Sequence, residues 1–459
     1  MTHRAAGLCR LLAVTVLLAA CGPGDGRSPG ASASTGPSDG AAPSAVAEPV
    51  TLRVQVSLTP QELASFTPAI EAIDDRHPEW IIRLEPVPQD AEIEKITNAL
   101  AGDDLADVVR VQGLTVQQWI RRGAFLDLTA RMATDGPGAA ELYPGPLEQF
   151  RWQERTWGVP DSASPEIVFF NRSMFEAAGL AEPTADWTYD DMRAAAVRLT
   201  LDASGRHPGE PGFDPEAIRQ WGWNGGLTYF WQDAFVRALG GALCANDDCT
   251  VMSFTDPATA AAVEWWVTLV RDDHAALWDP YGGSQTGVPG DPFLAGAAAM
   301  GSNGAFALGQ LDAAGTIDYG VLPPLVGRDG SRHTALSTAG YVIGAGTAHP
   351  DAAWALVREL TAVEFLAATW GRPGHGVPAR IAAAATSLEG AASPELRAAI
   401  LEAMAVGRVF RPYTASAFQA FAGTVDIFRQ MNTGVTSVAD GLEELEAVAN
   451  SALATDRTP

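Results

Sequence analysis

The sequence predicts an α/β fold built from two domains. Segments with strand-like alternation are followed by segments with helix-capping signals, an order typical of α/β layers with mostly parallel sheets. The chain from residue 50 onward holds about 400 residues, more than one hydrophobic core normally serves. Hydrophobic residues make up 47% of the chain, as in globular proteins.

The first predicted elements are a strand at 50–56 and the helix that follows it. Leu52 and Val54 alternate with polar residues, which indicates a strand. Thr59 can cap a helix, and Glu62 completes a capping box. The same signals predict further strands at 81–87 and 107–111, and helices at 90–100, at 192–199 after a capping box of Thr188 and Asp191, from 256 and from 393.

Two polar residues come at the ends of predicted strands, Ser57 after the first and Gln112 after 107–111. Parallel strands end at the same edge of a sheet, and open α/β sheets bind ligands beyond that edge. We therefore predict that Ser57 and Gln112 line a ligand cleft.

The N-terminus has the features of a secretion signal. Arg4 and Arg10 precede an apolar run that is too short to cross a bilayer, and small residues come just before Cys21. A cysteine in this place resembles the lipobox of bacterial lipoproteins, which implies a signal peptide at 1–20 and a lipid on Cys21. The alternative is an ordinary signal peptide. Residues 21–49 are then the lipidated cysteine and a flexible tether of Gly, Pro, Ser and Ala that spans roughly 30 Å.

The strongly acidic composition limits the partners. The net charge is −25 and the pI is about 4.5. Binding to nucleic acid relies on Lys and Arg, so we expect no nucleic-acid partner. Electrostatic docking on anionic lipid is disfavoured for the same reason, and the predicted contact with the membrane is the lipid on Cys21 alone.

Two of the four cysteines remain once Cys9 leaves with the signal peptide and Cys21 is lipidated. Cys244 and Cys249 form an even pair in an exported protein, which indicates a disulfide that closes a short turn. Their spacing does not suit zinc and no His lies near them, so we expect no metal.

Signatures of enzymes and of cofactor sites are missing from the sequence. The single lysine, Lys95, has no glycine-rich loop before it, which excludes a P-loop. Gly-x-Ser-x-Gly occurs at 26–30, inside the Gly- and Pro-rich tether, where no strand-to-helix turn is expected to present the serine, and His-Glu-x-x-His does not occur. We therefore predict a binding protein without a cofactor rather than an enzyme, with an exported hydrolase of unfamiliar type as the alternative.

Aromatic side chains are the chemistry that the sequence does supply. The chain has 13 Trp, 17 Phe and 7 Tyr, most densely placed at 221–231. Sugar rings have apolar faces and polar rims, so a site for them combines flat aromatic surfaces with hydrogen-bonding side chains in a cleft. The composition favours a carbohydrate ligand, while many of these rings are expected in the core.

Short motifs in a fixed order resemble the extracellular solute-binding proteins of ABC importers, in the group that includes maltose-binding protein. The strand 107–111 and the turn 123–128 begin the series, although Ala106 stands where the family usually has Pro. Further matching segments are 157–160, 168–172, 174–180, 187–191, 293–300, 318–323 and 349–354. They span nearly the whole body, and their order and spacing make the resemblance specific.

The resemblance implies a periplasmic-binding-protein-like fold of two α/β lobes around a central ligand cleft, with multiple hinge crossings. One lobe would hold residues 50–162 and 322–370, and the other 163–321 and 371–459. A ligand would favour the closed form through contacts that only this form offers.

The resemblance also implies a set of binding residues. Phe306 and Phe418 stand where the maltose-binding branch stacks aromatic rings on sugar. Ser164 stands where that branch has a Glu, which argues against maltose itself. The complete predicted set is Ser57, Gln112, Ser164, Tyr229, Trp231, Asn303, Phe306, Tyr341, Trp370, Arg372 and Phe418.

The function that follows is a receptor on the extracytoplasmic face of the bacterial membrane. We expect a monomer that is lipid-anchored at Cys21, binds a carbohydrate of the oligosaccharide class by hinge closure and delivers it to ABC permease subunits. An iron complex, a polyamine or a phosphodiester is the alternative ligand. Few tyrosines argue against iron, and few cationic residues argue against a phosphodiester.

Overall fold

The computed structural model describes residues 48–225, 231–246, 249–279, 285, 290–371, 375–389, 392–409 and 417–455. The chain divides into a unit of residues 1–47 and a unit of residues 48–459. The predicted signal peptide and Cys21 lie outside the described residues, and the fold below is that of the second unit.

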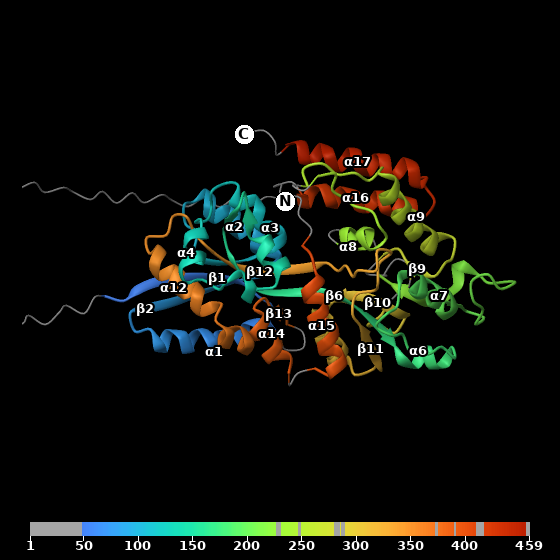
Figure 1. The fold of residues 1–459 in the computed structure, drawn as a ribbon, viewed down its shortest axis with the longest axis horizontal. Helices are drawn as coiled ribbons and strands as arrows, with labels where there is room; N and C mark the ends of the chain where they lie inside the picture. The colour runs from blue at the N-terminus through green and yellow to red at the C-terminus, as the bar shows by residue number, and fades with distance from the viewer. Residues whose placement is uncertain are drawn as a thin grey trace, which may run out of the picture. The chain divides into compact units, whose positions relative to one another are not determined.

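The main strands form one mixed sheet, whose first half carries the N-terminal strands (Figure 1). β2 (Trp80–Val87), β1 (Val50–Ser57) and β3 (Val108–Gln112) run parallel. β12 (Leu336–Ile343) lies antiparallel between β3 and β6 (Val159–Asn171). The strands predicted at 50–56, 81–87 and 107–111 are confirmed to within one residue at each end.

The second half of the sheet begins where β6 passes Pro165. Up to that residue β6 pairs with β12, and beyond it β6 pairs with β10 (Ala298–Gly304). β8 (Ile218–Asn224) runs parallel to β10, so both end at the same edge. Shorter strands complete the structure: β11 (Tyr319–Leu322) and β13 (Val377–Pro378) on β6, β7 (Leu201–Asp202) and β9 (Ala276–Leu277) on β8, and the separate pair β4 (Arg151–Trp152) and β5 (Arg155–Thr156).

Helices cover both faces of the sheet (Figure 1). They are α1 (Pro60–Arg76), α2 (Glu92–Ala101), α3 (Gly113–Ile120), α4 (Thr129–Asp135), α5 (Pro144–Gln149), α6 (Arg172–Ala177), α7 (Tyr189–Leu199), α8 (Trp231–Ala238), α9 (Pro257–Arg271), α11 (Leu308–Ala314), α12 (Pro350–Leu360), α13 (Val363–Thr369), α14 (Ile381–Leu388), α15 (Pro394–Val406), α16 (Ala417–Asn432) and α17 (Val438–Thr455). No helix in these ranges combines the length and the apolar character needed to cross a membrane.

The helix starts follow from local capping. The hydroxyl of Thr59 accepts from the Glu62 backbone N–H at 3.2 Å, and the Glu62 carboxylate accepts from the Thr59 N–H at 2.8 Å. The same reciprocal pair joins Thr188 and Asp191 at the start of α7. Both predicted capping boxes are confirmed, because such a box needs only residues three positions apart.

Each half of the sheet has its own apolar core. In the first half α1, α12 and α13 pack on one face and α3 on the other, whereas in the second half α7, α9, α16 and α17 cover one face and α15 the other. The largest fully buried side chains of these cores are Trp119, Trp370, Tyr341, Phe66, Phe150, Phe169, Phe175 and Phe254. The loop after β1, the end of β3 and the turn after β10 lie at the walls of a cavity between the two halves.

Candidate ligand-binding cleft

A cavity of about 790 Å³ lies between residues of the two sheet halves. From the first half it is lined by the loop after β1 and the end of β3, and from the second half by the turn after β10 and by α11. The lining residues are Thr59, Pro60, Gln61, Glu62, Gln89, Arg110, Gln112, Ser162, Ala163, Ser164, Phe306, Gly309, Gln310, Ala313, Ser337, Thr338, Ala339, Trp370 and Gly376. Glutamine amides, hydroxyls and small apolar residues line the cavity together with Phe306 and the almost fully buried Trp370.

A buried ion pair forms the floor of the cavity. Arg110 Nε donates to Asp161 Oδ2 at 2.6 Å, and Arg110 Nη1 donates to the Ser57 carbonyl at 3.0 Å. The guanidinium carbon lies 4.5 Å from the centre of the Trp370 ring. The charge on Asp161 raises the pKa of Arg110 against the opposing effect of burial. The ion pair thus joins β3 to β6, and its guanidinium packs against the Trp370 ring.

Gln112 is positioned by a second buried carboxylate. Glu92 accepts from the Gln112 backbone N–H at 3.1 Å and from the Thr115 hydroxyl at 3.3 Å. Burial raises the pKa of Glu92 above its usual value. These bonds fix the turn from β3 into α3 and place Gln112 at the wall of the cavity.

Phe306 and Ser164 meet on the opposite wall. The Ser164 hydroxyl accepts from the Phe306 backbone N–H at 3.3 Å, which joins β6 to the turn after β10. The Phe306 side chain is 39% exposed, a large fraction for such an apolar residue. An exposed ring held at a cavity wall offers a flat surface to a ligand.

Two polar atoms of lining residues are buried without a hydrogen-bond partner in the described part of the chain, Thr338 Oγ1 and Trp370 Nε1. A buried polar group without a partner costs free energy. A hydroxyl-rich solute that reached these atoms would supply the missing bonds.

The structure brings four predicted binding residues together at the cavity, Gln112, Ser164, Phe306 and Trp370. Ser57 and Tyr341 are fully buried in the first half and do not line the cavity. Asn303 does not line the cavity, because its side chain donates to Asp291 at 2.6 Å and accepts from the Gly304 N–H at 2.8 Å.

The remaining predictions cannot be placed. Tyr229 and Arg372 lie outside the described residues, and the side chains of Trp231 and Phe418 lie outside them as well. Sequence reasoning missed Arg110 and Asp161, although a lone arginine inside the apolar strand 107–111 signals a buried charge that needs a partner.

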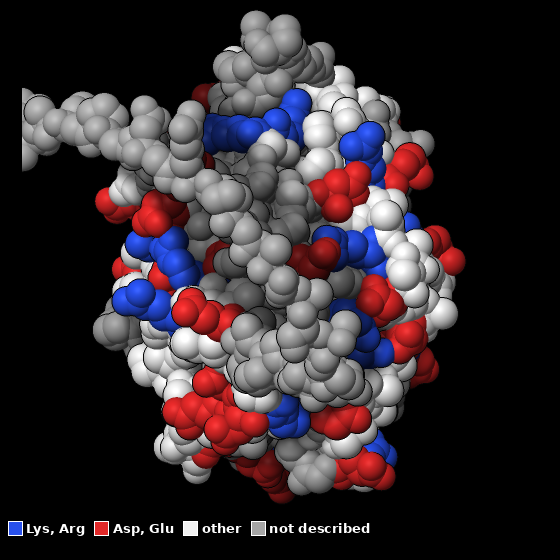
Figure 2. All heavy atoms as spheres, turned by 90° about the vertical axis from the view of Figure 1, so that its left-hand side faces the viewer, with Lys and Arg blue, Asp and Glu red and all other residues white. Residues whose placement is uncertain are grey.

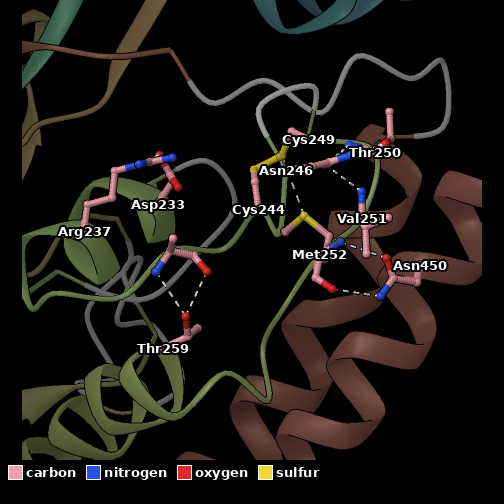
Figure 3. Close-up of a disulfide and its surroundings, with 11 residues drawn as sticks. Asp233, Arg237, Cys244, Asn246, Cys249, Thr250, Val251, Met252, Thr259 and Asn450 are labelled. Carbon is pink, nitrogen blue, oxygen red and sulfur yellow. Dashed lines mark hydrogen bonds and ion pairs between the residues drawn. A yellow bond between two sulfur atoms is a disulfide. The ribbon is translucent and has the colours of Figure 1, made fainter.

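The predicted disulfide between Cys244 and Cys249 is confirmed (Figure 3). The Cα atoms lie 4.9 Å apart, and the Asn246 side chain accepts from the N–H of Thr250, just after the closed turn, at 3.0 Å. Asn450 of α17 accepts from and donates to the backbone of Met252, which anchors the turn to the helix. In the part of the chain that the structure describes, no three His, Cys, Asp or Glu residues form a cluster that could hold a metal.

Replacing both cysteines by serine is expected to lower the free energy of unfolding by about 2 kcal/mol, because so short a loop restricts the unfolded chain only modestly. Urea denaturation of Cys244→Ser/Cys249→Ser and of the parent under oxidising conditions measures this. Equal midpoints would show that the disulfide adds no stability.

The α/β sheet with a cavity beyond the carboxyl ends of its strands defines a solute receptor of the periplasmic-binding-protein type. The model of the bacterial extracellular solute-binding protein family matches residues 59–364, more than half of the chain, and the chain belongs to this family. Members of the family are receptors rather than enzymes.

Related proteins agree with this assignment. Proteins described as binding proteins in Brucella abortus and Brucella suis are 25% identical over 137 residues, 29% of this chain. The match covers 32% of these relatives, about a third of their length.

Solved structures show the same fold over most of the chain. M. tuberculosis UspC is 24% identical, with a TM-score of 0.70 over 88% of this chain and 100% of its own. The cyclic α-maltosyl-1,6-maltose binding protein of Arthrobacter globiformis is 19% identical, with a TM-score of 0.74 over 89% and 100%. The substrate-binding protein of Listeria monocytogenes in complex with cycloalternan is 20% identical, with a TM-score of 0.71 over 89% and 100%.

Proposed function

We propose that this protein is a lipid-anchored receptor that binds an oligosaccharide in the cleft and delivers it to the permease of an ABC importer. The observation that carries the proposal is the cleft, a cavity of about 790 Å³ with an exposed phenylalanine ring on one wall and amides and hydroxyls around it. This size is typical of ligand pockets that enclose several sugar rings or a drug-sized molecule.

The lining suits a neutral, hydroxyl-rich solute. Gln61, Gln89, Gln112 and Gln310 offer both donors and acceptors, and Phe306 offers a stacking surface. The one arginine on the floor is already paired with Asp161, so it offers little to an anion. The names of similar structures, which include cycloalternan and cyclic α-maltosyl-1,6-maltose, support the same ligand class.

We further propose that the two sheet halves are the lobes that close on the ligand, with residues 50–162 and 322–370 in one and 163–321 and 371–459 in the other. β6 is the strand that passes from one half to the other. A small rotation about β6 near Pro165 would bring Phe306 toward Gln112, so a ligand that contacts both would favour the closed form.

The anchor completes the proposal. A lipid on Cys21 and the tether that follows would hold the receptor near its permease and raise its effective concentration there. Cys21→Ser is expected to release the protein from the membrane fraction of the cells that express it. Fractionation and immunoblotting measure this, and retention of Cys21→Ser in the membrane would contradict the anchor.

Thermal unfolding of the full chain with a panel of saccharides tests the binding function. A saccharide present at 100 times its dissociation constant should stabilise the protein by about 2.7 kcal/mol. Metal complexes and peptides serve as the comparison panel. Stabilisation by those and by no saccharide would overturn the proposal, as would turnover of a saccharide.

A further inference from the structure

A second, smaller pocket of about 50 Å³ lies in the second sheet half under α8. A water molecule needs about 10–15 Å³ on this measure, so the pocket accommodates a small polar group and not a sugar ring. Aromatic residues from four elements line it together with one acidic residue, Glu166. The acidic, aromatic and imidazole side chains among the lining residues are Glu166, Tyr189, Trp223, Phe235, Trp266 and His333.

Glu166 stands next to the main cleft. It lies on β6 two residues beyond Ser164, and it pairs across the sheet with Gly304, which precedes the turn that holds Phe306. Its backbone is fixed, because its N–H donates to the Ala335 carbonyl at 3.1 Å and its carbonyl accepts from the Thr334 hydroxyl at 2.7 Å. The residue as a whole keeps some contact with solvent, while its carboxyl is surrounded by protein atoms.

No cation balances the Glu166 carboxylate within the described residues. The titratable groups that share the pocket are Tyr189 and His333. His333 bonds to Ser331 at 2.8 Å and lies 3.4 Å from Asp329. On α8 the nearest charges pair with each other, since Arg237 donates to Asp233 at 2.7 Å. Burial raises the pKa of Glu166 to about 8.

We propose that this pocket receives a protonated amino group of the bound solute, with Glu166 as its counter-ion. A carboxylate ringed by aromatic side chains is suited to an ammonium group, because the rings attract cations and the carboxylate accepts their hydrogen bonds. The net charge of −25 favours the approach of cations. The inference rests on the proposed binding of saccharides in the adjacent cleft and narrows the ligand to those that carry an amine.

Binding of the amine is coupled to the loss of a proton from the Glu166 carboxyl. The ammonium ion prefers ionised Glu166, so a proton leaves the carboxyl when the cation enters. With a pKa of about 8, Glu166 is ionised to about 1% at pH 6 and to about 90% at pH 9. The affinity for an amine that stays charged over this range should therefore rise roughly 90-fold from pH 6 to pH 9.

Calorimetric titrations of the full chain test the pocket with two kinds of probe. Propylammonium, whose pKa is close to that of lysine at about 10.4, gives the pH profile. A glucosamine trimer and a glucose trimer of the same linkage differ by an amine against a hydroxyl of similar size, and show whether the amine may come from a saccharide. Glu166→Gln removes the charge, and Glu176→Gln on the exposed surface of α6 is the matched control.

We expect the amino trimer to bind at least tenfold more tightly than the glucose trimer at pH 7, where much of its amine is charged, and this preference to vanish in Glu166→Gln but not in Glu176→Gln. Saccharide binding without a preference for the amine would overturn this inference alone. If propylammonium bound more tightly as the pH rose and no saccharide bound, the proposed function would be overturned. Glu166 would still mark a pocket that binds an ammonium group. A flat pH profile of the parent protein would overturn the inference even if Glu166→Gln failed to fold.

Discussion

Arg110→Ala is expected to lower the free energy of unfolding by about 3–5 kcal/mol, one of the largest effects of any single substitution in this chain. The reason is the environment of its partner, since the Asp161 side chain is fully buried and lies 2.6 Å from Arg110. Without the guanidinium, Asp161 keeps a buried charge that must either stay unpaired or take up a proton. Urea denaturation measures the loss.

Arg358→Ala is the matched control. Arg358 also forms an ion pair at 2.7 Å, with Asp135, but both side chains are more than a third exposed, at 47% and 40%. Exposed pairs contribute about 0–1 kcal/mol. Equal losses in the two variants would mean that Arg110 and Asp161 are solvated in the protein and that the floor of the cleft is open to water.

The local elements of the fold could be predicted from the sequence. The capping boxes of Thr59 with Glu62 and of Thr188 with Asp191 depend on residues three apart, and the strands at 50–56 and 107–111 show their own alternation. The passage of β6 from one sheet half to the other could not be predicted in this way, because its partners lie more than a hundred residues away in β10 and β12.

The cleft was predictable only in part. Gln112 was predicted as a cleft residue from its place after a strand. Ser164, Phe306 and Trp370 were predicted from the resemblance to the family, and all four line the cavity. Arg110 and Glu92 were missed because their roles depend on Asp161 and Thr115, which are 51 and 23 residues away. Glu166 was missed for a different reason, since nothing in the sequence distinguishes it from a solvated carboxylate.

The charge distribution shows why composition alone did not locate the site. On the face in Figure 2, acidic and basic side chains are interspersed in the described part of the surface rather than gathered by sign. The net charge of −25 therefore describes a solvated surface and long-range attraction for cations. The chemistry of the cleft depends instead on a few uncharged and internally paired groups.

Phe306→Ala is expected to weaken oligosaccharide binding by about 10–100-fold while leaving the unliganded protein nearly as stable as before. Removing a stacking ring from a binding site costs about 1–3 kcal/mol of affinity. The ring is already 39% exposed without ligand, so its loss leaves little additional cavity in the core. Calorimetric titration gives the affinity, and urea denaturation without ligand gives the stability.

The control for Phe306 is Phe213→Ala, which removes a half-buried ring that contacts His274 and does not line the cleft. It should leave the affinity unchanged. If Phe306→Ala bound as tightly as the parent, the ring would not touch the ligand, and the saccharide would have to be held by the other residues that line the cleft. If it instead lost several kcal/mol of stability without ligand, Phe306 would be a core residue and its exposure at the cavity wall would have another cause.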